Sequence, residues 1–226
     1  MFGKQNLGAD LGGEESGYRE FHLRADIKQS RLVLILFAIP IIGFVFNDYL
    51  FFGISGLFYE VISVRIALLI VIGLELLYLQ KVKSYQAYDK VVFFSILAMI
   101  VGGGFVNATR PSNFIITSLI SIVSVFVIYL GVPLKLGFQV FLASFLTIGE
   151  SLIILVLSKN LATTFLFALL FSMLVANLLA AFSAWQTHSY RRRTYREFMQ
   201  RKALQDKLEQ HANHLSDLVK DRTKDL

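Results

Sequence analysis

Ionisable residues inside apolar stretches are the first place to look for chemistry in this sequence. The second predicted span carries Glu60, Arg65 and Glu75, and the fifth carries Glu150. A charged side chain in the hydrocarbon core of a membrane is costly, so such residues usually serve a ligand, an ion path or a buried pair. Arg65 lies eight residues from the start of the stretch Leu57–Leu79, and Glu150 lies seven residues from the end of Leu134–Leu157. At 1.5 Å per residue both lie about 10–12 Å below the same surface. We therefore expect them to pair or to face one polar cavity, unless Arg65 reaches the interface along its own aliphatic stem.

Other polar residues gather at the same outer level. The candidate ligand-pocket residues are Asp48, Glu60, Arg65, Asn107, Arg110 and Glu150. Aromatic residues surround them: Tyr49, Phe51, Phe52, Phe58, Tyr59 and Phe105. An aromatic pocket with a few converging charges suits a small or hydrophobic ligand that enters from outside. The alternative is that these aromatic side chains form the belt that membrane proteins place at the interface.

Catalytic and metal-binding patterns are missing from the sequence. The four histidines are His22, His188, His211 and His214. The spacing of His211 and His214 would allow both to bind one metal ion, but the sequence offers no third ligand near them. The chain contains no Cys, which excludes thiolate zinc sites, iron–sulfur clusters and redox pairs. It also contains no GxSxG, P-loop or HExxH motif. The sequence thus predicts no catalytic residue and no metal, and it leaves any cofactor unknown.

The elements that must position these residues are transmembrane helices. Of the 226 residues 55% are hydrophobic and only 17% are charged, whereas soluble domains have roughly 25% charged residues. Stretches of about 20 apolar residues span a bilayer. The six candidates are Arg31–Phe52, Leu57–Leu79, Val91–Phe105, Asn113–Leu130, Leu134–Leu157 and Leu161–Trp185. The fold class is therefore an all-α membrane protein, with an arm at residues 1–30, a six-helix domain at 31–185 and a signalling helix at 186–226.

The positive residues predict the orientation of these helices. Nineteen of the 22 Lys and Arg residues lie in four segments: the N-terminal arm, the loop between the second and third spans, the loop between the fourth and fifth spans, and the tail. Only Arg110 and Lys159 lie on the opposite side, and Arg65 lies within a span. Cytoplasmic loops carry such an excess, so both termini are expected in the cytoplasm of a multi-pass protein of the cytoplasmic (inner) membrane. The net charge of +6 then faces lipid headgroups, and nucleic acid is not an expected partner.

The tail has the composition of a long helix. From Thr187 to Leu226 it contains no Pro and no Gly. Leu204, Leu208, His211, Leu215 and Leu218 follow the 4-3-4-3 spacing of a coiled-coil seam. We expect a parallel homodimer; the alternative is one amphipathic helix lying on the bilayer. In the last span, Asn177 is expected to hydrogen-bond to a neighbouring helix or to the partner subunit.

Two segments resemble a known kind of junction. Ala176-Asn177, followed by Ser189-Tyr190-Arg191-Arg192-Arg193 and Arg196-Glu197-Phe198, resembles the end of the six-helix MASE-type sensory membrane domains of bacteria. The segment Leu218–Leu226 is similar to linkers that precede PAS and histidine-kinase modules. The resemblance implies a sensory input domain without catalytic activity of its own. It would signal to a histidine kinase, a diguanylate cyclase or a class III nucleotide cyclase. Because the chain stops in mid-helix, we expect that effector to follow in a longer protein.

A small transporter or channel is the alternative function. Arg65 and Glu150 support it, since buried charges mark ion and substrate paths. The sequence shows no half-to-half repeat and no matching pair of Gly- or Pro-broken helices, which many transporters have. A long coiled-coil tail also favours the sensor.

Overall fold

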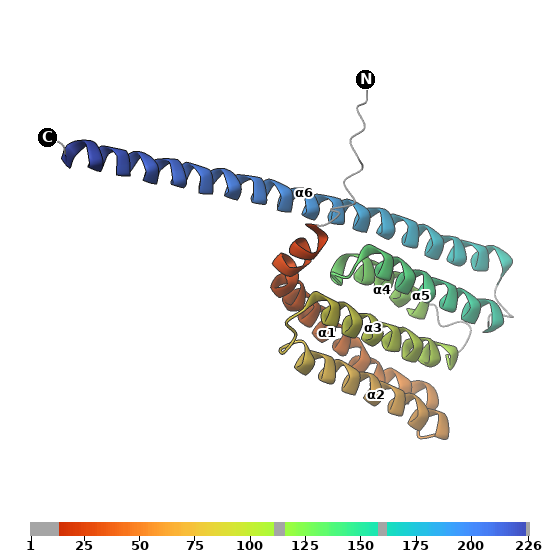
Figure 1. Ribbon diagram of the computed structural model, residues 1–226. Helices are drawn as coiled ribbons and strands as arrows, with labels where there is room; N and C mark the ends of the chain where they lie inside the picture. The colour runs from red at the N-terminus through yellow and green to blue at the C-terminus, as the bar shows by residue number, and fades with distance from the viewer. Residues whose placement is uncertain (1–13, 111–115, 158–161, 225–226) are drawn as a thin grey trace. The chain divides into compact units, whose positions relative to one another are not determined.

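The computed structural model describes residues 14–110, 116–157 and 162–224, and nearly all of them are helical (Figure 1). The elements are α1 (Glu15–Phe52), α2 (Gly56–Tyr78), α3 (Tyr85–Ala108), α4 (Ile116–Phe126), the π-helical turn η2 (Val127–Gly131), α5 (Leu136–Leu157) and α6 (Thr163–Lys224). The described residues contain no strand, so the all-helical prediction is confirmed for them. They form two compact units, a bundle of residues 19–186 and a smaller unit of residues 14–18 and 187–224.

Local sequence signals explain where several helices begin and end. Ser55 precedes α2, and its hydroxyl accepts a hydrogen bond from the backbone N–H of Phe58. Ser84 caps α3 in the same way, accepting from the N–H of Ala87. Such caps satisfy N–H groups that have no partner within a helix. Gly53, with φ of +52°, makes the turn between α1 and α2.

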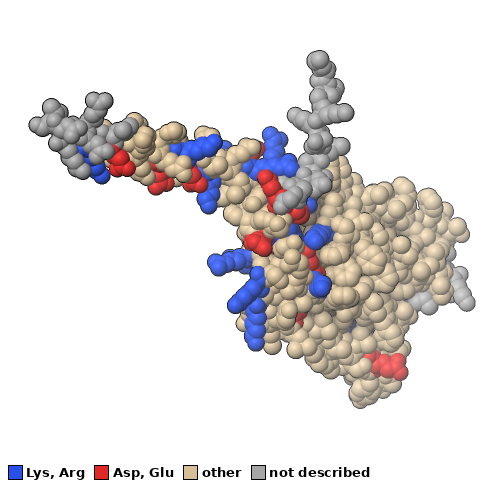
Figure 2. Space-filling view, in the orientation of Figure 1, with Lys and Arg blue, Asp and Glu red and all other residues tan. Residues whose placement is uncertain are grey.

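Five of the described helices are long and apolar enough to cross a membrane: α1, α2, α3, α5 and α6. The fourth predicted span is shorter, an apolar helical segment over Ser118–Gly131. Asn113, its predicted first residue, lies outside the described residues. Many large apolar side chains of the bundle are exposed, and the flank seen in Figure 2 is largely uncharged, with Lys and Arg gathered at one end. These features are those of a membrane-embedded protein.

The bundle is held together by close helix packing. α2 packs against α3, α3 against α5, and α4 and η2 against α5. Gly102 allows the first of these contacts, because a Cβ at this position would lie 2.8 Å from Leu68 Cδ2. Small residues at helix interfaces let backbones approach in this way. A core of buried apolar residues, Tyr88 and Leu142 among them, runs through these interfaces.

The helices of the bundle have unusual features at three places. Pro40 lies inside α1, where it removes one helical hydrogen bond. In α3, Gly103 and Gly104 follow Gly102 and leave a stretch without side chains. After α4 the chain widens into η2, closed by a bond from Val132 N to Val127 O of 3.2 Å.

A buried glutamine holds the end of η2. The Nε2 atom of Gln139, in the first turn of α5, donates to the backbone oxygens of Tyr129 at 3.1 Å and of Val132 at 2.5 Å. Gln139 is 2% exposed. Its amide satisfies carbonyl groups that the helix end leaves without a helical partner.

The smaller unit joins the start of α1 to the middle of α6. The Tyr18 and Tyr195 rings meet edge to face with centroids 5.5 Å apart. Arg192 Nη2 lies 3.0 Å from Glu15 Oε1, and its guanidinium lies over the Tyr18 ring. Residues 15–30 of the predicted N-terminal arm are helical and form the first turns of α1.

The tail of α6 carries the predicted seam on its surface. Leu204, Leu208 and Leu215 are each more than 60% exposed, and His211 is exposed as well. The side chain of Leu218 lies outside the described part of the chain. The single chain therefore leaves this apolar stripe uncovered.

Candidate functional site

A cavity of about 160 Å³ lies inside the bundle. α1, α2, α3, α4, η2 and α5 all contribute to its walls. Most of the lining is apolar, including Phe37, Pro40, Ile41, Phe44, Leu68, Ile96, Met99, Ile100, Val106, Ile120, Ile128 and Leu146. Gly103 and Gly104 line it too, so their missing side chains help to keep the space open. Concave apolar sites with a few polar groups are typical of small-molecule binding.

Two arginines of the lining, Arg65 and Arg110, share one buried carboxylate, that of Asp48. Arg65 Nε donates to Asp48 Oδ2 at 2.5 Å, and its Nη2 donates to Oδ1 at 3.2 Å. Arg110 Nη2 also donates to Oδ1. The Asp48 side chain is fully buried, so these cations replace the water that its charge would otherwise need.

Helix ends and aromatic rings position these charges. Asp48 lies in the last turns of α1, Arg65 in α2, and Arg110 just after the C-cap of α3. The Arg65 guanidinium lies 5.9 Å from the centroid of Phe44. The Arg110 guanidinium lies over two rings, those of Phe51 and Phe52. Aromatic faces attract cations, and two of the predicted belt residues, Phe51 and Phe52, pack against a charged group in this way.

The predicted ion pair between Arg65 and Glu150 is replaced by two separate contacts. Arg65 binds Asp48, while Glu150 Oε1 accepts from Asn107 Nδ2 at 2.5 Å. Both residues line the same cavity, which was the other arrangement expected from their depth. Arg65 instead meets the carboxylate that Asp48 presents from α1. Depth along a helix does not determine which side of the helix a residue occupies.

Four of the six predicted pocket residues line the cavity: Arg65, Asn107, Arg110 and Glu150. Asp48 lies behind them and binds both arginines. Glu60 was predicted to join them, but its side chain is exposed and does not line the cavity. Glu60 begins the second turn of α2, and the next turns direct Arg65 inward instead.

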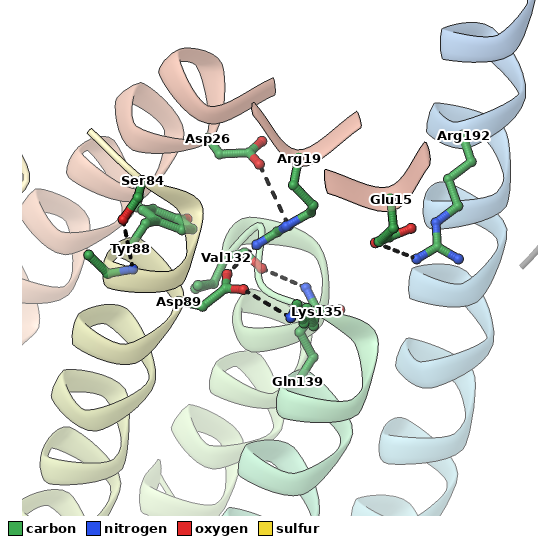
Figure 3. A network of polar contacts seen from close by, with 12 residues as sticks. Glu15, Arg19, Asp26, Ser84, Tyr88, Asp89, Val132, Lys135, Gln139 and Arg192 are labelled. Carbon is green, nitrogen blue, oxygen red and sulfur yellow. Dashed lines mark hydrogen bonds and ion pairs between the residues drawn. The ribbon is translucent and has the colours of Figure 1, made fainter. Parts of the chain in front are cut away.

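A second buried ionic layer was not predicted from the sequence (Figure 3). Arg19 of α1 binds Asp89 of α3, and its Nη1 lies 3.8 Å from Asp26 Oδ2. Lys135 Nζ lies 3.9 Å from Asp89 Oδ2. Close by, Ser30 Oγ and the Tyr88 hydroxyl are 2.7 Å apart. Arg19 and Asp26 are one heptad apart, a spacing that places both on one helix face and is the only sequence signal for this layer.

Asn177 of α6 forms the interhelical bonds expected of it. Its Nδ2 donates to Ala143 O at 3.1 Å and to Thr147 Oγ1 at 2.7 Å, and its Oδ1 accepts from the Tyr129 hydroxyl. Glu75, another ionisable residue of the predicted spans, is only 2% exposed. It is one of the buried residues of α2, as Arg65 is.

A largely apolar space with a few charged and polar groups is an arrangement suited to binding a molecule. Among the described residues that line the cavity there is no histidine or cysteine. No group of three or more His, Cys, Asp or Glu residues suited to a metal occurs within the described ranges. A comparison of the chain with protein-family models, with curated proteins and with solved structures finds no match.

Proposed function

We propose that this chain is the sensory input part of a membrane signalling protein. A ligand or membrane stimulus would act on the cavity, and α6 would carry the resulting change to a cytoplasmic effector. The observation that carries this proposal is the continuity of α6, one helix of 62 residues. Its first half joins the bundle through Asn177, and its second half carries the exposed leucine stripe.

The directions of the helices support six membrane crossings. α3 and α5 begin close together, where Asp89 and Lys135 pair, and both end near the bond between Asn107 and Glu150. The two helices are therefore parallel, and the chain between them must return across the bundle through α4 and η2. With the positive residues concentrated as in cytoplasmic loops, this route leaves both termini in the cytoplasm.

A parallel homodimer is the proposed state of the tail. The exposed leucines repeat at coiled-coil spacing, and burying them against a second copy removes apolar surface from water. Two α6 helices joined in this way form an element with alternative registers or rotations. A ligand that favours one of them would shift the equilibrium and so the output.

Disulfide cross-linking in native membranes tests the dimer. The chain has no Cys, so the introduced cysteines are the only thiols of the protein that can cross-link. Leu208→Cys and Leu215→Cys should cross-link quickly, whereas the matched control Asn213→Cys, on the opposite face of the same helix, should not. Equal rates at all three positions would refute the seam.

The same assay tests whether the cavity controls the tail. Arg65→Gln in the Leu208→Cys background should change the cross-linking rate severalfold, because it alters the polar wall of the cavity. Glu60→Gln is the matched control, since Glu60 is an exposed residue of the same helix. If both substitutions leave the rate unchanged, the cavity does not act on α6.

A small transporter or channel is the second candidate. The buried Asp48–Arg65–Arg110 cluster at the cavity favours it, because intramembrane charges often mark ion or substrate paths. Flux of ions or small solutes into proteoliposomes containing the purified chain would support this function over the sensor.

A further inference from the structure

The cavity has two chemically different ends. Asp48, Arg65 and Arg110 are joined by ion pairs, and Asn107, one helical turn before Arg110, binds Glu150. The remaining lining is almost entirely aliphatic and aromatic, with Ser121 and Ser124 as its other polar side chains. A ligand that fits both ends has one polar head and an apolar body.

The formal charges at the polar end cancel. Arg65 and Arg110 carry two positive formal charges, and Asp48 and Glu150 carry two negative ones. A charged ligand would bring an uncompensated charge into a buried site, and such a charge is strongly unfavourable. A neutral head leaves the balance intact, so the site favours a neutral ligand over an acid or an amine.

The hydrogen-bonding groups restrict the head further. The arginines carry only donors, so a head that bonds to them accepts the hydrogen bond. The Glu150 carboxylate accepts from Asn107 and can also accept from a head that donates. A hydroxyl group does both through one oxygen atom, whereas a ketone, ester or ether can only accept.

The volume of the cavity indicates the size of the apolar body that it can hold. An engineered apolar cavity of about 150 Å³ takes up benzene, and the cavity of this protein is about 160 Å³. The walls near Phe37, Ile128 and Leu146 suit a single ring or a short branched chain.

We propose that the cavity binds a small neutral alcohol or phenol whose hydroxyl bridges the Arg65–Asp48–Arg110 cluster and Glu150. This inference rests on the proposed function, because it names the ligand class of the same cavity. The hydroxyl accepts from a guanidinium N–H and donates to the Glu150 carboxylate, and the ring or chain fills the apolar end.

Equilibrium dialysis of labelled benzyl alcohol against the chain in nanodiscs tests the proposal, with empty nanodiscs subtracted for partitioning. Toluene, benzoate and benzylamine have similar bodies and different heads. Benzyl alcohol should bind about tenfold more tightly than each of them, since hydrogen bonds to charged groups are worth at least that factor. Equal binding of toluene, or tighter binding of either charged compound, would overturn the proposal.

Filling variants show whether the molecule occupies this cavity. A Cβ added at Gly103 meets no atom within 4 Å, so Gly103→Met should fold and occupy part of the space. Ser124→Met fills the cavity from α4. Both should lower benzyl alcohol binding more than fivefold. The matched control Gly73→Met, in α2 and also free of contacts, should bind as the native chain does. Native-like binding by both filling variants would refute this location.

A charge variant tests the head without changing the cavity volume. Glu150→Gln keeps the size of the side chain and leaves one positive charge in excess. Benzoate should then bind more tightly than benzyl alcohol, the reverse of the native order. An unchanged order would refute the charge argument.

Separate results would refute the proposed sensory function and the proposed ligand class. If benzyl alcohol binds as stated but leaves Leu208→Cys cross-linking unchanged, the ligand class stands and the sensory function fails. If Arg65→Gln alters cross-linking but no alcohol binds, the sensor stands and the ligand class is wrong.

Discussion

Replacing Asp48 with Asn should destabilise the protein more than replacing either arginine that binds it. Asp48 is fully buried and holds Arg65 through two hydrogen bonds and Arg110 through another. Asp48→Asn keeps the shape of the side chain but leaves both guanidinium groups without their carboxylate. Arg65→Gln, in contrast, leaves Asp48 bound to Arg110.

The expected sizes follow from these contacts. Removing one partner of a buried ion pair costs about 3–5 kcal/mol. Asp48→Asn belongs to this class, because both arginine side chains are less than a tenth exposed. Arg65→Gln loses hydrogen bonds to a charged group, worth about 1.5–3 kcal/mol. The free energy of unfolding should therefore differ between the two variants by about 2 kcal/mol.

Unfolding in mixed micelles with increasing dodecyl sulfate, followed by far-ultraviolet circular dichroism, measures this difference. Glu60→Gln, an exposed polar residue of α2, is the control and should change the free energy of unfolding by less than about 0.5 kcal/mol. If Arg65→Gln destabilises the protein as much as Asp48→Asn does, the carboxylate is not the shared centre of the cluster.

Three further substitutions test other parts of the structure. Leu208→Glu should weaken the dimer, and light scattering in detergent should then give a lower mass than for the native chain. An unchanged mass would argue against the seam. The same loss of mass in Asn213→Glu, a variant on the opposite face of the helix, would also argue against it. Gln139→Leu removes two bonds to carbonyl groups around η2 and should destabilise by about 1–3 kcal/mol, with faster hydrogen exchange confined to that turn. Asp89→Asn leaves Arg19 with Asp26 alone and should lower the free energy of unfolding by about 1–3 kcal/mol in the same micelle titration; no change would show that the layer adds nothing to stability.

The helices themselves were largely predictable from hydropathy. The predicted stretch Leu57–Leu79 differs by one residue at each end from α2, and Leu134–Leu157 begins two residues before α5. The prediction for α3 was too short, because hydropathy detects only the apolar part of a helix. The polar first turns from Tyr85 continue the same helix, and Ser84 caps it. The start of α1 was missed for the same reason.

The sequence allowed us to predict which residues belong to the candidate site, but not which of them bind one another. Position along a span gave the depth of Arg65, Asn107 and Glu150, and all three line the cavity. Which carboxylate meets Arg65 depends on how α1 and α2 are rotated about their axes, and depth contains no such information. The bond between Arg19 and Asp89 joins residues 70 positions apart, and only the packing of α1 against α3 brings them together.

The proline, the glycines and the π-helical turn of the bundle have a mechanical consequence. Pro40, Gly103 and Gly104 all line the cavity, and so does Ile128 of the π-helical turn. At each place a wall of the cavity coincides with a missing helical bond, an absent side chain or a widened turn, where helices bend most readily. The bundle therefore bends most readily around the cavity. A molecule of slightly different size would be accommodated there by bending three helices a little rather than by breaking any charge pair.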